Sequence, residues 1–302
     1  MVQKPMAVLG GGAGAHMMAA DLTNRGFAVH LYEHPRLAEG FRPTLEKGAV
    51  AVTGIGPVGT FKLERVSTDM AATLEGAQWI NVVIPAVGHD LFFRELIPCL
   101  KPGHKVVVWA GDFGSLLLRQ RLLEQGRLED VVIMETNTLP YGTRVTGPAS
   151  VALLVSAPEV MAAALPSPGV AGAVEELKTI FPCVFQGRHV LEAAFNNPNP
   201  IVHPPGSLLN TGRIEYSGGD FRMYGEGITQ SVAYVIKAVY EESDQLARAL
   251  DFRMKQYRDI DFRTKCSIMG VEFEAPFDTC GVIGSILGPT SVQSRYITED
   301  LP

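Results

Sequence analysis

A glycine cluster between a short apolar run and a helical pattern constrains this chain more than any other feature. The segment VLGGGAGAHMMAADLTNRG places Gly10, Gly12 and Ala15 at the spacing G-x-G-x-x-A, directly after a predicted strand and before a predicted helix. In that pattern the first glycine makes a tight turn, the second lets the backbone approach a pyrophosphate, and the small third residue lets the helix pack closely. The free N–H groups at the start of the helix, around Ala13 and Gly14, would bind the phosphates. The segment therefore predicts a dinucleotide-binding turn in an α/β sheet.

An acidic residue, Glu33, ends the second predicted strand, about 20 residues beyond the glycines. A carboxylate at this place accepts hydrogen bonds from the ribose 2′-hydroxyl of NAD and repels the 2′-phosphate of NADP. Arg36 follows shortly after and offers a guanidinium that pairs with a 2′-phosphate. The sequence thus favours NAD(H) as cofactor and leaves NADP(H) open.

Apolar segments with the length of strands recur through the first half of the chain and alternate with helical patterns. The segment WINVVIP, residues 79–85, is nearly all apolar, as expected of a parallel strand covered on both faces. The pattern predicts strands at residues 6–10, 27–33, 49–53, 79–85, 105–111 and 130–136, and a further strand at 150–158. Repeated strand–helix units of this kind predict an α/β, Rossmann-like fold with a parallel, doubly wound sheet.

Helical periodicity dominates the second half of the chain. Between Glu226 and Leu250 the apolar residues fall at helical spacing, at Ile228, Val232, Val235, Ile236, Val239, Leu246 and Leu250. We place the domain boundary near Gly187. Residues 1–187 are expected to form an NAD(P)-binding Rossmann-like domain, and residues 188–302 a mainly α-helical domain that carries substrate and catalytic groups.

Composition narrows the classes of function. A hydrophobic fraction of 46% with 19% charged residues is that of a globular chain, and 302 residues suffice for two domains. The net charge of −6 argues against nucleic acid or an anionic membrane as a partner, and no run approaches about 18 consecutive apolar residues. The chain shows no signal-peptide pattern, no metal-ligand spacing and no CxxC pair. These features favour a cytoplasmic protein with reduced thiols.

One histidine stands in an unusual proline-rich segment, NNPNPIVHPP, residues 196–205. Proline fixes φ and removes a backbone donor, so we expect a shaped loop here rather than a regular helix. Among the seven histidines, His203 is the best candidate for a general acid or base, because imidazole holds both protonation forms near neutral pH. A lone histidine in a proline-rich turn is also a common structural residue, and position alone does not separate the two interpretations.

A hydride-transfer site for a carboxylate substrate would need more than a histidine. An arginine would bind the carboxylate through its planar fork, and an acidic side chain would orient the imidazole. The closing segment SRYITED offers Arg295, Glu299 and Asp300. Nothing in the residues alone brings this segment to His203.

Several segments together resemble the opine dehydrogenases, the octopine/nopaline dehydrogenase group, over nearly the whole chain. They are the glycine segment, VIPAVGHDLFF, METNTLPYGTR, NNPNPIVHPPGSLLNTG and RYITEDLP, of which ETNTLPY and NPNPIVHPP are the more specific. The resemblance implies a Rossmann-like domain followed by a helical one. It also implies that an amino acid is joined to a 2-oxo acid, often pyruvate, and that the resulting imine is reduced with NAD(P)H. Pro85 and Ala86, in the second of these segments, are then expected to contact the cofactor.

Residue roles follow from the same resemblance. His203 is implied to be the acid/base and Asp300 the carboxylate that orients it. Arg295 is implied to bind a substrate carboxylate, and Thr136 and Thr138 to line the substrate entry near the nicotinamide. The family usually continues beyond the segment TEDLP, so the second domain is expected either to be truncated at Pro302 or to be shortened in the enzyme itself.

Two other functions stay open. Reductases of the 3-hydroxyacid or ketopantoate type commonly carry a lysine in the first helix of the second domain, and PPGSLLNTGRIEY contains none. A dinucleotide-binding sensor without activity would not need His203, Arg295 and Asp300 together. The sequence leaves the amino acid, the oxo acid and the assembly undecided, and a homodimer is compatible with it.

Overall fold

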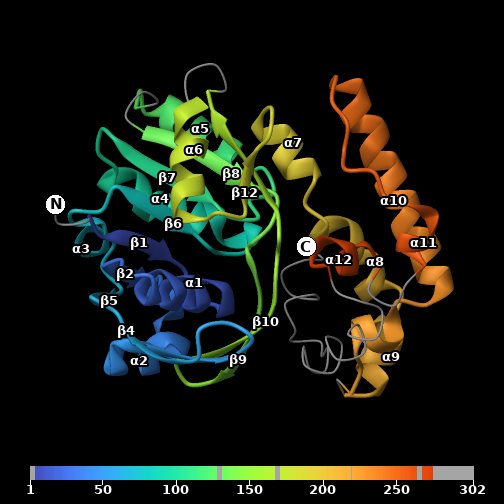
Figure 1. The fold of residues 1–302 in the computed structure, drawn as a ribbon, viewed down its shortest axis with the longest axis horizontal. Helices are drawn as coiled ribbons and strands as arrows, with labels where there is room; N and C mark the ends of the chain where they lie inside the picture. The colour runs from blue at the N-terminus through green and yellow to red at the C-terminus, as the bar shows by residue number, and fades with distance from the viewer. Residues whose placement is uncertain (1–3, 128–130, 167–170, 219, 264–266, 275–302) are drawn as a thin grey trace.

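An eight-stranded sheet forms the centre of the first part of the chain (Figure 1). The computed structural model describes residues 4–127, 131–166, 171–218, 220–263 and 267–274. The sheet order is β12-β11-β8-β7-β6-β1-β2-β5. The strands are β1 (Met6–Leu9), β2 (Val29–Tyr32), β5 (Arg65–Ser67), β6 (Trp79–Val82), β7 (His104–Val108), β8 (Val131–Thr136), β11 (Val160–Leu165) and β12 (Val184–Gln186).

The direction of the strands confirms the predicted Rossmann-like class. Strands β5, β2, β1, β6, β7 and β8 are all parallel, and β11 joins β8 antiparallel. The order reverses at β1, which lies between β2 and β6. A doubly wound sheet binds its ligands at such a switch point, beyond the carboxyl ends of the strands.

Helices cover both faces of this sheet, which explains why β1, β2 and β6 are buried along their whole length. One apolar core joins the sheet to α1 (Ala13–Asn24) and α6 (Ala171–Ile180). A second core joins the other face to α3 (Met70–Leu74), α4 (His89–Cys99) and α5 (Gly114–Glu124). The two cores hold the carboxyl ends of β1 and β6 side by side.

The strand predicted at residues 49–53 does not belong to the main sheet, so that prediction is wrong in its placement. It is β3 (Ala49–Gly54), in a second sheet of order β4-β3-β10-β9 with β4 (Gly59–Lys62), β9 (Tyr141–Gly147) and β10 (Ser150–Ser156). Burial alternates along β3, as in a sheet with one face on a core and the other exposed. This second sheet packs on α1, and the hydroxyl of Tyr141 donates to Asp21 of that helix at 2.5 Å.

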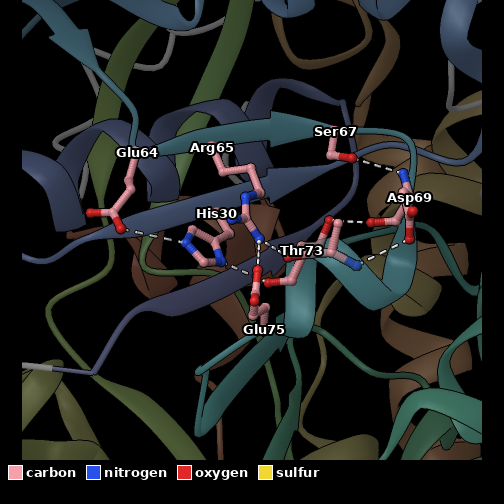
Figure 2. A network of polar contacts seen from close by, with 8 residues as sticks. His30, Glu64, Arg65, Ser67, Asp69, Thr73 and Glu75 are labelled. Atoms are coloured by element: carbon pink, nitrogen blue, oxygen red, sulfur yellow. Dashed lines mark hydrogen bonds and ion pairs between the residues drawn. The ribbon is translucent and has the colours of Figure 1, made fainter.

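A short polar network ties the edge of the main sheet to α3 (Figure 2). Nδ1 of His30, on β2, donates to the carbonyl of Thr73 at 2.8 Å, and Arg65, on β5, pairs with Glu75 at 2.9 Å. Asp69 caps α3 by accepting from the N–H of Ala72 at 3.0 Å. These contacts fix the β2–β5 edge of the sheet. The turn Pro35–Leu37 and α2 (Ala38–Lys47) come after β2 in the chain.

Short helices and one long helix make up the described residues after β12 (Figure 1). They are α7 (Val190–Phe195), α8 (Asn199–Leu208), α9 (Thr211–Tyr216), a π-helical turn η5 (Met223–Gly227), α10 (Gln230–Ala249), α11 (Asp259–Phe262) and α12 (Ser267–Glu272). A separate apolar core runs from Ile201 to Ile268. The expected order, α/β first and helical second, is confirmed.

Near its C-terminal end, the long helix α10 buries other side chains than the apolar ones predicted from the sequence. Val232 and Ile236 are buried as expected, but Leu246 and Leu250 are 59% and 51% exposed. The buried stripe continues instead through Tyr240 and Asp244. Asp244 accepts hydrogen bonds from the returning segment at Met254 and Gln256, so a polar contact replaces the apolar one there. Within the described residues, no helix is both long enough and apolar enough to cross a membrane.

Candidate functional site

The glycine turn lies at the switch point of the main sheet, between β1 and α1. Gly10 has a φ of +126°, and a Cβ there would lie 2.3 Å from the carbonyl oxygen of Val83 at the end of β6. Gly12 is the N-cap of α1, is exposed, and has nothing within 4 Å of the place its Cβ would take. A Cβ on Gly14 would lie 2.9 Å from Leu139, and Ala15 is buried. The turn is thus tight on its inner side and open on its outer side, as a pyrophosphate cradle requires.

Glu33 lies beneath this turn. One carboxylate oxygen accepts from the N–H of His34 at 2.6 Å, and the other lies 2.4 Å from where a Cβ on Gly11 would be. Burial raises the pKa of Glu33, against the backbone hydrogen bonds of His34 and Gly11, which lower it. Arg36 is exposed on the turn that follows. The arrangement offers an acceptor for a ribose hydroxyl directly beside the glycines.

Pro85 and Ala86 are exposed at the carboxyl end of β6, on the other side of the switch point. His89 comes next and begins α4, but its ring is buried and stacks on Phe93 with 5.3 Å between centroids. Burial lowers the pKa of His89 to about 4, and its Nε2 has no hydrogen-bond partner among the described residues. A Cβ on Gly114 would lie 2.4 Å from the ring, so His89 packs against the start of α5.

The turn between β7 and α5 combines three positive-φ residues that are not glycine. They are Ala110, Asp112 and Phe113, with φ of 49°, 42° and 68°. Side chains of β8 hold this turn: Glu135 accepts from the N–H of Phe113 at 2.9 Å and of Ser115 at 3.0 Å. A conformation of this kind costs about 1–3 kcal/mol per residue and persists where neighbours enforce it. The turn and Glu135 were not singled out from the sequence, although both lie at the carboxyl ends of parallel strands.

Thr136 and Thr138 are buried behind the same turn. The hydroxyl of Thr136 accepts from the N–H of Ala110 at 3.0 Å and donates to the carbonyl of Thr138 at 2.9 Å. Thr136 therefore fixes the backbone on both sides of itself. A role of these two threonines at the substrate entry stays a prediction.

Two asparagines of the segment NNPNPIVHPP join the α/β part to the helical part. The amide of Asn197 donates to Asp112 at 2.6 Å, across to the strained turn. The carbonyl of Asn196 accepts from Asn137, after β8, at 3.3 Å, and its side-chain oxygen accepts from the N–H of Lys255 at 2.6 Å. These bridges position the chain immediately before α8.

The proline-rich segment is not a loop, so that prediction is wrong. Residues Asn199–Leu208 form the α-helix α8, which contains Pro200, His203, Pro204 and Pro205. Pro200 lies in the first turn, where the N–H groups have no intrahelical acceptor and a proline loses nothing. Pro204 and Pro205 do remove two intrahelical bonds, but the helix continues, and Leu209 N–H bonds to the carbonyl of Pro205 at 3.2 Å.

His203 lies inside the helical part and has a hydroxyl partner. The imidazole is 3% exposed, and its Nε2 is 2.6 Å from the hydroxyl oxygen of Tyr224, which is 6% exposed. Tyr224 comes from the π-helical turn η5 and was not singled out from the sequence. Arg295 and Asp300, the other predicted members of the site, lie outside the described residues.

Replacing Glu135 with glutamine is expected to remove a pH-dependent loss of stability. Burial raises the pKa of Glu135 from 4.5 to about 7. Between these two pH values the folded protein holds a proton that the unfolded chain has released, so the free energy of unfolding falls as the pH rises. The shift corresponds to a decrease on the order of 3 kcal/mol. Urea unfolding at several pH values measures this effect. The free energy of unfolding of wild type minus that of Glu135→Gln should decline across this window and then level off.

The titration of His89 and the loss of one negative charge must be separated from this effect. Burial lowers the pKa of His89, which gives the opposite dependence, but His89 is present in both proteins and cancels in the difference. Glu124→Gln, at the exposed end of α5, controls for the loss of one negative charge. A difference between wild type and Glu135→Gln that is constant with pH would contradict the raised pKa.

Comparison with known proteins identifies relatives of both parts of the chain. Residues 186–302 match the family described as NAD/NADP octopine/nopaline dehydrogenase, alpha-helical domain. Opine dehydrogenase of Arthrobacter sp. (strain 1C) is 28% identical over 302 residues, which cover 99% of this chain and 82% of that protein. Protein ocs of Agrobacterium vitis is 27% identical over 309 residues, covering 98% and 82%.

Solved structures share the fold. Octopine dehydrogenase in complex with NADH and agmatine superposes with a TM-score of 0.67 at 17% identity, over 99% of this chain and 82% of that one. Other structures of octopine dehydrogenase hold NADH with pyruvate or with L-arginine, at TM-scores of 0.65 and 0.66, 19% identity, and coverage of 99% of this chain and 81% and 82% of theirs. Yersinopine dehydrogenase without ligand gives a TM-score of 0.70 at 15% identity, over 95% of this chain and 76% of that one.

Proposed function

Because the chain belongs to the opine dehydrogenase family, we propose that it joins an amino acid to a 2-oxo acid such as pyruvate and reduces the imine with NADH or NADPH. One arrangement carries the proposal. An open glycine turn lies at the switch point of the sheet. Asparagine bridges tie to this sheet the chain just before α8, the helix that carries the buried imidazole of His203. The first is what a dinucleotide needs, and the second is what a proton transfer beside it needs.

The residues at the switch point fit a dinucleotide. Gly10, Gly12 and the first turn of α1, from Ala13 to Ala15, would hold the pyrophosphate, since the outer side of the turn is open. Glu33 would accept from the adenosine ribose, and the exposed Arg36 keeps NADPH acceptable. Pro85 and Ala86 would contact the nicotinamide half. When bound, the cofactor supplies the hydride.

His203 would move the protons. As a neutral base it takes a proton from the substrate ammonium, so that the amine can attack the carbonyl carbon. As imidazolium it returns that proton to the hydroxyl that leaves as water when the imine forms. After reduction, the product amine takes a further proton from solvent. A positioned acid/base of this kind contributes about 10²–10⁴-fold to the rate.

The remaining assignments belong to the same proposal. Asp300 would orient His203, Arg295 would bind a substrate carboxylate, and Thr136 and Thr138 would line the entry. The proposed domains are residues 1–187 and 188–302. Their boundary is supported by the start of the family match at residue 186 and by the helical core, which begins at Ile201. A cleft between them would keep water from hydrolysing the imine.

The test is the loss of NADH absorbance with pyruvate and a panel of amino acids, repeated with NADPH. Oxidation should require both the oxo acid and an amino acid, because the reducible imine forms only from the pair. Oxidation with the oxo acid alone would favour a hydroxyacid reductase instead. No oxidation by a protein that still binds NADH would contradict the proposed activity and favour a dinucleotide sensor.

A further inference from the structure

The hydrogen bond between His203 and Tyr224 joins two buried groups that lie on different elements. Nε2 and the phenol oxygen are 2.6 Å apart, and the two rings meet edge to face with 6.1 Å between centroids. Both side chains are more than nine-tenths buried. A contact this short between two buried polar groups restricts the imidazole to a narrow range of orientations.

A π-helical turn supplies the tyrosine. Residues Met223–Gly227 form this turn, in which the N–H of Glu226 and of Gly227 both bond to the carbonyl of Arg222, at 2.8 and 3.3 Å. π-Helical turns are rare, and they are found frequently at functional sites. Here the turn directs the side chain of Tyr224 at α8.

Two glycines and one asparagine pack the π-helical turn and its surroundings tightly. A Cβ on Gly206 would lie 2.8 Å from the sulfur of Met223, and one on Gly227 would lie 2.4 Å from the ring of Phe221. Asn210 closes the contact, because its amide donates to the carbonyls of Gly206 at 2.8 Å and Gly227 at 3.0 Å. Asn210 thus joins α8 to the π-helical turn beside the pair formed by His203 and Tyr224.

We propose that Tyr224 is a positioning residue that holds His203 through Nε2, so that Nδ1 is the ring nitrogen that exchanges the proton with the substrate. A phenol can accept from Nε2–H and can also donate to a bare Nε2, so the contact persists in the imidazolium and in either tautomer of the neutral ring. A carboxylate only accepts and an ammonium only donates, so neither would keep the contact in all of these forms. The inference rests on the proposed role of His203 and adds the group that keeps its ring in place.

The test compares Tyr224→Phe with a control variant, Tyr216→Phe. Tyr216 lies on the neighbouring helix α9 and is 92% exposed. Turnover of Tyr224→Phe should fall about 10- to 100-fold, because the buried ring loses a hydrogen bond in its charged form, while KM for NADH stays the same. In ¹⁵N-histidine NMR spectra, assigned with a His203→Gln sample, the Nε2 signal of His203 should shift in Tyr224→Phe. It should be unchanged in Tyr216→Phe.

Turnover within about threefold of wild type, with only a lower unfolding midpoint, would overturn the proposal by showing a merely structural role. If wild type oxidises no NADH, the proposed function fails, and the NMR comparison still decides this inference: an unshifted Nε2 signal overturns it. If Tyr224→Phe does not fold, 3-fluorotyrosine at position 224 replaces it. This nearly isosteric, more acidic phenol should shift the Nε2 signal, and no shift would count against the proposal.

Discussion

Replacing His203 with glutamine is expected to lower turnover about a hundredfold or more while leaving NADH affinity unchanged. Glutamine cannot take up and return a proton near neutral pH, but its amide can stay near the place of Nε2. Tyr224, 2.6 Å from that nitrogen, therefore keeps a hydrogen-bond partner, and the loss is confined to proton transfer. The measurement is NADH oxidation at saturating oxo acid and amino acid, together with an NADH titration followed by fluorescence.

A second histidine of the same part of the chain serves as the matched control. His189 is the N-cap of α7, where its Nδ1 accepts from the N–H of Glu192 at 3.1 Å. Asparagine is a good N-cap, so His189→Asn should fold and turn over like wild type. Near-normal turnover in His203→Gln would refute the acid/base role. A loss in both variants would point to a general effect on the helical part instead.

Replacing Gly12 with valine is expected to weaken NADH binding roughly 10- to 100-fold. The free energy of unfolding of the ligand-free protein should stay the same. Gly12 has a φ of −80°, which valine adopts easily, and nothing lies within 4 Å of the new Cβ. The added methyl groups would instead project to the outer side of the turn, where a pyrophosphate must approach the backbone. NADH titrations and urea unfolding measure the two effects separately.

Gly40→Val provides the control, because Gly40 on α2 is likewise exposed and has open space around its Cβ position. It should bind NADH like wild type. If Gly12→Val also binds NADH normally, the dinucleotide does not lie against this turn. If its free energy of unfolding falls with its affinity, the experiment measures folding and not binding.

The glycine turn and the strands beside it could be predicted because their signals are local. Gly10 carries a backbone requirement of its own, and β1 and β6 are buried on both faces, which makes their sequences nearly all apolar. The strand predicted at residues 49–53 was assigned to the wrong sheet, although AVAVT alternates. That alternation matches a strand with one exposed face, which is how β3 is buried.

The helix around His203 could not be predicted from proline content alone. Pro200 falls in the first turn, and the loss of two hydrogen bonds at Pro204 and Pro205 is offset by packing of Ile201 and Val202 into the helical core. Tyr224 and Glu135 were missed for another reason. Each acts on a group about 20 residues away along the chain, and no sequence period encodes such a contact.

The second sheet has a consequence for how the protein is made. β3 is complete once residue 54 has been synthesised, but its parallel partner β10 arrives much later, since Val52 pairs with Val151. At about 5–20 residues per second, the growing chain would carry this strand with one edge open for roughly 5–20 s. Val151 and Leu153 of β10, which belong to the same apolar core as α1, are missing during the same interval. Synthesis between these two strands is therefore when a chaperone would protect the nascent chain most, and when pairing with a foreign strand is the greatest hazard.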